Sequence, residues 1–309
     1  SDSVRDRHMP PLWARPLRAR EHQSDDDSSA RDLGDLLTDS AENLLSMGRA
    51  TAGFLRSVLR RRDVGSFITP LGTPRSTLNR SIGSQRRFAT QQFEQSRIQD
   101  LADATGSTLN EILAYLCGSS LRRFFKEYNA LPDESLIGGM PVSLQERSES
   151  LPGNAIAGLR VSLGTHIGDP LARLAAVRES MKEVRRDRAS LPEESVTAYV
   201  MMRAAPIYAS QAPGLGRLVP PLFNLTVSHT PGADSPRFFN GARLEAIYPM
   251  SQLMQFSALS IDCVSYAGTL NVGFTGARDT LPHLQRMAVY LGKALEDLEE
   301  LVLEEELTR

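Results

Sequence analysis

The chain has 309 residues and a mass of 34.0 kDa, with 41% hydrophobic and 23% charged residues, a balance typical of a soluble globular protein. A net charge of −2 and a pI of about 6.2 exclude the overall basic character of many nucleic-acid-binding proteins, so we predict no nucleic-acid partner. No stretch approaches the roughly eighteen consecutive apolar residues of a membrane-spanning helix, and we predict no membrane span.

The first 85 residues are predicted to form a linker. Residues 1–30 are polar and rich in Pro, Arg and Asp, whereas apolar residues recur at helical spacing over about 31–62. That amphipathic helix ends in three arginines and suits two roles. Its apolar stripe either packs on the protein itself or contacts an anionic lipid surface.

Residues 86–309 are predicted to form one folded domain. The expected helices begin and end at signals such as Gly106 as a C-cap and Asp169 as an N-cap, and the last two strands are joined by a turn at Ala267-Gly268. Helices are predicted over 96–106, 108–129, 169–190, 192–211 and 281–304, and strands over 86–94, 135–144, 155–164, 222–229, 242–249, 256–266 and 269–276. Because these elements do not alternate regularly, the pattern predicts an α/β two-layer sandwich with a mixed β-sheet.

The two cysteines, Cys117 and Cys263, lie in apolar runs far apart in the sequence. Neither belongs to a CxxC pair or to a cluster with metal-ligand spacing. We therefore expect buried, reduced thiols, no metal site and a cytoplasmic protein.

The segment FNLTVSHTPG, residues 223–232, has two unlike faces. Alternation along a strand places Asn224, Thr226 and Ser228 on one side and places His229 with the apolar residues on the other. Buried hydroxyl and amide groups need partners, so the polar side suits a water-poor tunnel or an oxyanion site. The other interpretation is an edge strand whose polar side meets solvent.

The segment Thr108-Leu109-Asn110-Glu111 has the spacing of a capping box, in which the Thr108 side chain and the Glu111 carboxylate cap a helix reciprocally. The sequence contains no P-loop, dinucleotide-binding glycine pattern, GxSxG elbow or metal-ligand cluster. His229 has no acidic residue closer than Asp234 to orient it, which speaks against proton transfer by this histidine.

A family resemblance is carried by six blocks in a fixed order: STLNEILAYLCGSSLRRFF, GGMPVSL, GDPLARLAAVRES, FNLTVSHTPG, FNGARLEAIYPMS and LSIDCVSYAGTLNVGFTGARDTLP. From about residue 86 to its end the chain resembles the C-terminal part of bacterial wax ester synthase/diacylglycerol acyltransferases. The resemblance implies a chloramphenicol acetyltransferase-like fold in which two similar α/β domains share an active site. It also implies transfer of a long-chain acyl group from acyl-CoA to a fatty alcohol or diacylglycerol, without a cofactor.

The family's catalytic base is the second histidine of an HHxxxDG motif, and this sequence has no His-His pair. The resemblance therefore implies the C-terminal two thirds of the enzyme, whose partner is an N-terminal segment that carries the motif. We expect this chain alone to be inactive and to lie in the cytoplasm or at the inner membrane or lipid inclusions. The alternative is a non-catalytic module of the same fold that binds lipid or CoA.

Site residues follow from the same resemblance. The family's Asn-Asp pair corresponds to Asn110 and Glu111, for which we expect a structural role, and His229 stands where the family has Asn. By analogy with related acyltransferases, Thr226 and Ser228 are candidates to support the oxyanion, and Asn224 is a candidate to bind substrate. The small residues Gly241 and Ala246 are expected to line the acceptor channel, or else to allow close helix packing.

Overall fold

The computed structural model describes residues 73–143, 156–190, 210–211 and 220–308. The predicted linker helix over 31–62 lies outside the described residues, as does most of the predicted helix over 192–211, of which Ser210 and Gln211 are described as helical. None of the helices in the described part of the chain combines the length and apolar character needed to cross a membrane.

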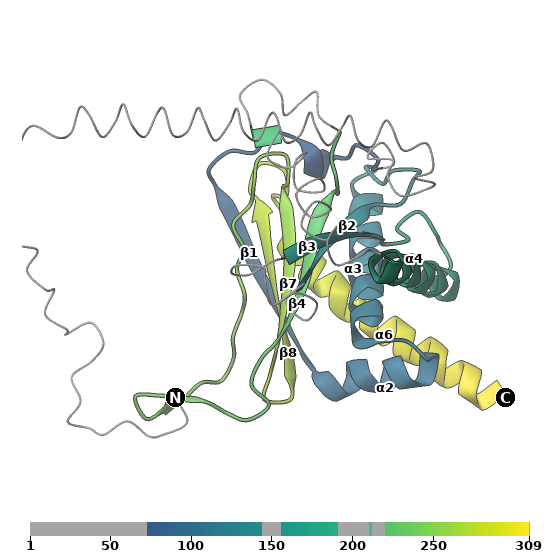
Figure 1. The fold of residues 1–309 in the computed structure, drawn as a ribbon, viewed down its shortest axis with the longest axis vertical. Helices are drawn as coiled ribbons and strands as arrows, with labels where there is room; N and C mark the ends of the chain where they lie inside the picture. Colours follow the sequence, from purple (N-terminus) through teal and green to yellow (C-terminus); the bar gives the residue numbers. More distant parts are fainter. Residues whose placement is uncertain (1–72, 144–155, 191–209, 212–219, 309) are drawn as a thin grey trace, which may run out of the picture. The chain divides into compact units, whose positions relative to one another are not determined.

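Six strands form one sheet, in the order β1-β8-β7-β4-β2-β3 (Figure 1). In chain order they are β1 (Arg86–Glu94), β2 (Ile137–Ser143), β3 (Ile156–Ser162), β4 (Leu225–Pro231), β7 (Leu259–Tyr266) and β8 (Thr269–Ala277). Strand β4 pairs parallel with both β2 and β7, whereas the other neighbours pair antiparallel. The prediction of a mixed sheet is therefore confirmed.

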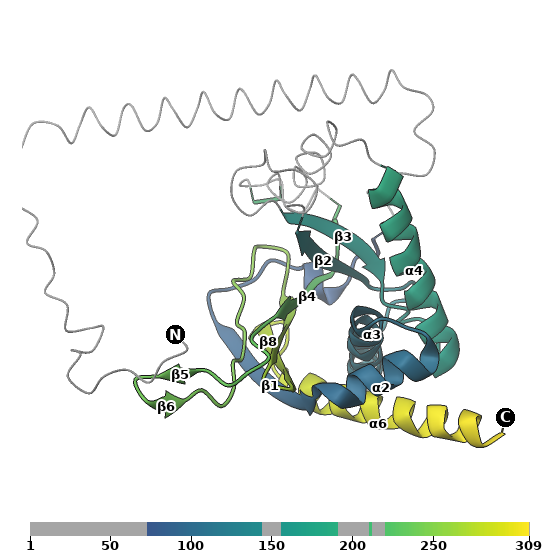
Figure 2. The same cartoon turned by 60° about the horizontal axis from the view of Figure 1, so that its bottom comes forward.

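In the described part of the chain, four helices cover one face of this sheet (Figures 1 and 2). They are α2 (Gln95–Thr105), α3 (Leu109–Glu127), α4 (Pro170–Ser190) and α6 (Gln285–Thr308). The predicted boundaries are confirmed at three caps, because Gly106 is left-handed at φ 60°, Thr108 forms the capping box, and the Asp169 carboxylate accepts from the Ala172 N–H at 2.7 Å. One helical layer on one mixed sheet is the predicted two-layer α/β sandwich.

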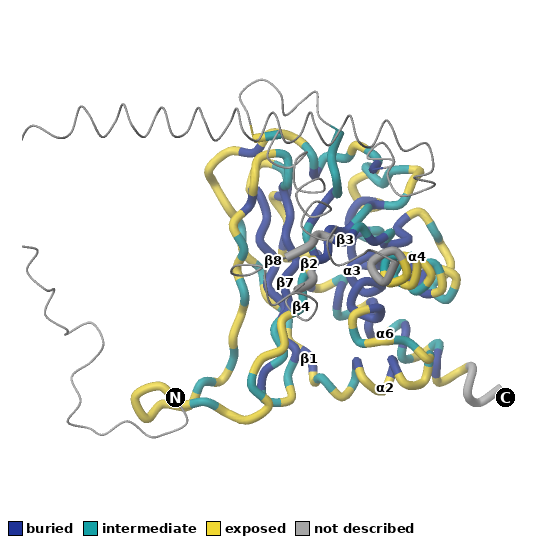
Figure 3. Tube along the Cα trace, viewed as in Figure 1, coloured by how far each residue is buried: buried dark blue, intermediate teal, exposed yellow. Residues whose placement is uncertain are grey.

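The hydrophobic core lies between the sheet and these helices, where Figure 3 shows the buried positions gathering. On β4, Leu225 and Val227 are fully buried in that core while Thr226 and Ser228 between them are only half-buried. Cys117 and Cys263 are both buried free thiols, as predicted, and burial raises the pKa of Cys117 to about 12. The alternation of β4 thus turns its hydroxyls away from the helices.

The opposite face of the sheet is crossed by the irregular segment that follows Arg243. At Gly273 of β8, which pairs with Asp262 of β7, a Cβ atom would lie 1.9 Å from the Pro249 carbonyl oxygen, so the two backbones approach too closely for a side chain. The predicted strand over 242–249 is wrong: only Ala242–Arg243 (β6) is extended, paired with Phe238–Phe239 (β5) in a short hairpin. The segment that was expected to add a strand instead covers the sheet.

Candidate functional site

A cavity of about 1150 Å³ lies on the sheet face that the helices leave uncovered. Its walls come from the 3-10 turn η3 (Thr77–Asn79), the segment after α3, the approach to β4, and the irregular segment before β7. The apolar part of this lining consists of Ala130, Leu131, Pro132, Pro141, Pro220, Pro221, Leu222, Phe223, Met254 and Phe256. The volume slightly exceeds the roughly 300–1,000 Å³ usual for small-molecule sites.

The floor of the cavity is polar and is built from two neighbouring parallel strands. Thr226 of β4 lies beside Ser260 of β7, and Ser228 lies beside Asp262. The Ser228 hydroxyl donates to one carboxylate oxygen of Asp262 at 2.7 Å, and the Ser260 hydroxyl donates to the other at 2.8 Å. Two residues of the predicted polar side, Thr226 and Ser228, therefore face the cavity, and their hydroxyl groups have different hydrogen-bond roles.

Thr226 and Ser228, the two predicted oxyanion candidates, are separated by this geometry. The Ser228 hydroxyl hydrogen is used by the Asp262 carboxylate, so this side chain offers only lone pairs to the cavity. No other described residue hydrogen-bonds the Thr226 hydroxyl, which keeps its hydrogen for a ligand. Of the two, Thr226 is the one placed to donate to an oxyanion.

Asn224, which was expected to bind substrate, is fully buried one residue before β4 and does not line the cavity. Its Oδ1 accepts from the Ile137 N–H at 2.7 Å, and its Nδ2 donates to the Pro74 carbonyl and to Asn79 Oδ1, each at 2.7 Å. Asn79 in turn donates to the Phe223 carbonyl at 3.0 Å. The side-chain amide of Asn224 thus links residues 74–79, which form one wall of the cavity, to the start of β4 by hydrogen bonds.

Gly241 and Ala246, the predicted channel residues, are not among the described residues that line the cavity. Gly241 is exposed at the tip of the β5–β6 hairpin, where both Asn240 and Gly241 have positive φ angles of 51° and 80°. A two-residue turn of this kind favours glycine. Ala246 is half-buried in the irregular segment that follows.

His229 lies on the helix side of the sheet, away from the cavity. Its Nδ1 is 3.1 Å from Asn110 Oδ1 at the start of α3, and its Nε2 is 2.8 Å from the Ser265 hydroxyl. Burial lowers the pKa of His229, which favours the neutral imidazole near pH 7. The predicted placement with the apolar face is confirmed, and the ring joins β4 to β7 and α3.

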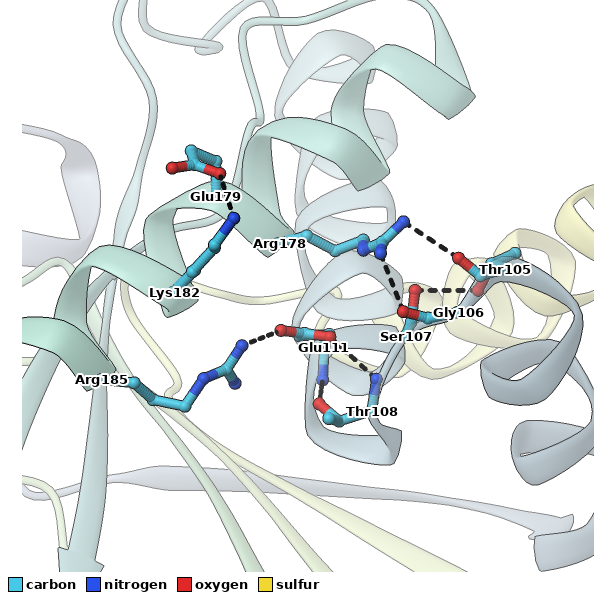
Figure 4. Close-up of polar contacts among 9 residues, drawn as sticks. All are labelled: Thr105, Gly106, Ser107, Thr108, Glu111, Arg178, Glu179, Lys182 and Arg185. Atoms are coloured by element: carbon cyan, nitrogen blue, oxygen red, sulfur yellow. Dashed lines mark hydrogen bonds and ion pairs between the residues drawn. The ribbon is translucent and has the colours of Figure 1, made fainter.

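Glu111 connects α3 to α4 (Figure 4). Its carboxylate accepts from the Thr108 N–H at 2.8 Å and from Arg185 of α4 at 2.5 Å, while Arg178 donates to the carbonyls of Thr105 and Gly106. Burial alone would raise the pKa of Glu111, but the hydrogen bonds from Arg185 and Thr108 hold it below the ordinary 4.5. The capping box is therefore also an anchor for the neighbouring helix.

Replacing Glu111 with glutamine is expected to lower the free energy of unfolding by about 1–3 kcal/mol at pH 7. Because the folded-state pKa is depressed, this contribution is complete above pH 4.5 and is lost as the pH falls further. Urea unfolding at pH 7 and near pH 3.5 measures both effects, with Glu179→Gln as the control because Glu179 forms only exposed ion pairs with Lys182 and Arg186. Equal losses for the two variants at pH 7 would contradict the anchor role.

Sequence reasoning missed Ser260 and Asp262. The signal was present, because alternation along LSIDCVSY places both on the side away from Ile261 and Cys263. What alternation does not give is the partner strand, since Ser228 and Asp262 are 34 positions apart. In the described part of the chain, no group of three His, Cys, Asp or Glu side chains is arranged to hold a metal.

Two family models match the chain. The wax ester synthase/diacylglycerol acyltransferase catalytic domain matches residues 1–113, and the C-terminal domain of the same family matches residues 152–299. Leu78 lies within the predicted linker of residues 1–85, yet its side chain is fully buried in the same hydrophobic core as residues of the folded domain.

Known proteins of this family are similar over most of the chain. A putative diacylglycerol O-acyltransferase of Mycobacterium tuberculosis is 37% identical over 259 residues, which is 81% of this chain and 52% of the relative. A probable diacylglycerol O-acyltransferase, tgs2, of the same organism is 34% identical over 292 residues, or 94% of this chain and 63% of the relative. The solved wax ester synthase/diacylglycerol acyltransferase from Marinobacter aquaeolei VT8 superposes with a TM-score of 0.71 at 27% identity, covering 98% of this chain and 62% of that one.

The chain thus spans between about half and two thirds of the length of these relatives. Its two family matches together cover most of the sequence, and the mixed sheet has the fold of the Marinobacter enzyme. The chain belongs to the wax ester synthase/diacylglycerol acyltransferase family.

Proposed function

We propose that this chain forms the acyl-transfer site of an O-acyltransferase, which moves a long-chain fatty acyl group from acyl-CoA to a fatty alcohol or a diacylglycerol. The family membership and the names of the relatives support the reaction class. The observation that carries the proposal is the cavity itself, in which a group of apolar side chains that includes Phe223, Met254 and Phe256 lines the same space as a floor with hydroxyl groups. A fatty chain fits the walls, and a reacting thioester needs polar groups at one defined point.

Thr226 is proposed to stabilise the negative charge that develops on the thioester oxygen during attack. Its hydroxyl faces the cavity from a strand whose other side is packed in the core, so its position is held by the sheet. A donor fixed before the reaction begins lowers the barrier without a cost of reorganisation.

Arg75 and Arg80 are proposed to contact the phosphates of CoA. Both residues line the cavity and both are exposed, which suits a charged group that stays near solvent. Guanidinium groups bind phosphate oxygens through paired hydrogen bonds, and the acyl chain would then extend inward along the apolar wall.

The base that takes the proton from the acceptor hydroxyl is proposed to come from an HHxxxDG-bearing segment outside these 309 residues. None of the described histidines, His166, His229 and His283, lines the cavity. His229, the one histidine on β4, already contacts Asn110 and Ser265 on the other side of the sheet.

Photolabelling tests the site directly. Palmitoyl-CoA with a diazirine near the end of its acyl chain is irradiated with the protein, and labelled peptides are identified by mass spectrometry. Labels are expected on the cavity wall, above all on Phe223, Met254 and Phe256, and excess unlabelled palmitoyl-CoA should remove them. Competable labels confined to α2, α4 or α6 would overturn the assignment.

A further inference from the structure

The feature without an assigned role is the Asp262 carboxylate at the floor of the cavity. Asp262 is 5% exposed and Ser260 is 2% exposed, yet both belong to the cavity lining together with Ser228. The two serine hydroxyls donate to different oxygens of the same carboxylate. We call these three side chains, Ser228, Ser260 and Asp262, the carboxylate cluster.

The carboxylate cluster has no positive partner in the described part of the chain, where no Lys, Arg or His side chain forms an ion pair with Asp262. A buried carboxylate is costly unless hydrogen bonds replace the water that it loses. Its two oxygens have about four acceptor positions, of which the serines use two. The cluster therefore has unused capacity beside the cavity.

The unused hydrogen-bonding positions of the carboxylate cluster are all acceptors. Each serine has already given its hydroxyl hydrogen to Asp262, so the serine lone pairs and the remaining carboxylate lone pairs can accept hydrogen bonds but not donate them. The negative charge also repels phosphate and the oxyanion of the reacting thioester. The group that fits is uncharged and carries a strong hydrogen-bond donor.

We propose that the carboxylate cluster binds and orients the hydroxyl group of the acyl acceptor. This inference rests on the proposed function, since it concerns the second substrate of that reaction. The thioester carbonyl has no hydrogen to donate, whereas the hydroxyl of a fatty alcohol or a diacylglycerol does. In the bound complex this single hydrogen is donated to the cluster, and the HHxxxDG histidine takes it when the alcohol oxygen attacks the thioester carbonyl. Thr226, one alternation step from Ser228 along β4, offers a donor and so serves the carbonyl, while the cluster serves the alcohol. Asp262 is thus a positioning and specificity residue, and Ser228 belongs to the alcohol rather than to the oxyanion.

The test uses the enzyme assembled from this chain and an HHxxxDG-bearing segment of the family, with palmitoyl-CoA and 1-hexadecanol as substrates. Asp262→Asn keeps the size of the side chain but replaces the charge and one acceptor with a donor. We expect the KM for hexadecanol to rise about tenfold or more, the loss typical of a hydrogen bond to a charged group. The KM for palmitoyl-CoA should change less than twofold. Asp100→Asn, which removes an equal charge from an exposed position on α2, is the matched control.

A thiol acceptor of the same length separates this role from a general effect on folding. The S–H group of 1-hexadecanethiol is a weak donor, so it gains little from the carboxylate cluster. The ratio of the KM for hexadecanethiol to the KM for hexadecanol should therefore fall about tenfold in Asp262→Asn. An unchanged ratio, or a rise confined to the KM for palmitoyl-CoA, would overturn the inference. Absence of ester from the wild-type assembly would instead refute the proposed function.

Discussion

Thr226→Val is expected to lower kcat for acyl transfer about 100-fold, the loss typical of removing one oxyanion donor. Valine has the shape of threonine and suits a strand, so β4 should keep its pairing with β2 and β7. The Thr226 hydroxyl has no partner among the described residues that its removal would leave unsatisfied. The effect should therefore appear in catalysis and not in stability.

Steady-state kinetics of the assembled enzyme with palmitoyl-CoA and hexadecanol provide the measurement. Thr226→Ser retains a hydroxyl at the same position and should recover most of the lost kcat, while the KM for palmitoyl-CoA stays close to the wild-type value in both variants. A kcat for Thr226→Val within threefold of wild type would remove Thr226 from the mechanism. A similar loss in the serine variant would point to packing of the β-branched side chain instead.

Much of the fold could be predicted from the sequence, because caps, turns and helical periodicity depend on residues that are close together in the chain. The caps at Gly106 and Thr108 and the turn at Ala267-Gly268 each depend on residues within one helical turn or one hairpin. The helix that begins after Thr108 was equally clear, since its apolar positions recur at helical spacing and are buried in the structure. Such features are fixed by backbone geometry and short-range hydrogen bonds, whatever lies around them.

The predicted strand over 242–249 failed for the opposite reason. A strand needs a partner, and alternation alone does not supply one. Residues after Arg243 pass over the open sheet face, where the missing side chain of Gly273 makes room for the Pro249 backbone. Gly241 has a positive φ angle in a two-residue turn, a feature of backbone conformation that its small size in the sequence does not reveal.

The candidate site shows the same division. Alternation correctly placed Thr226 and Ser228 on one side, because that inference needs only the chain direction of β4. The register that brings Asp262 beside Ser228 depends on two parallel strands meeting across a crossover, which no short pattern encodes. Because the Ser228 hydroxyl donates to the Asp262 carboxylate, it does not donate to a ligand. The sequence pattern therefore predicted the position of Ser228 correctly but not its hydrogen-bond partner.

The largest expected effect concerns the base. Attack on a thioester by an alcohol requires that the hydroxyl proton be removed, and imidazole is the side chain best suited to this near pH 7. The sequence contains five histidines and no His-His pair, and none of the three in the described part of the chain lies at the cavity. The Asp262 carboxylate already accepts one hydrogen bond from each of two serine hydroxyls. The 309-residue chain is therefore expected to bind acyl-CoA without transferring the acyl group.

Ester formation with and without the HHxxxDG-bearing segment tests this account most directly. The purified 309-residue chain is incubated with palmitoyl-CoA and hexadecanol, or with a diacylglycerol, alone or with that segment added as a separate chain, and the esters are quantified by mass spectrometry. A segment in which the second histidine of the motif is replaced by alanine is the control. We predict ester only when the intact segment is present. Turnover by the 309-residue chain alone, or equal turnover with the control segment, would contradict the account.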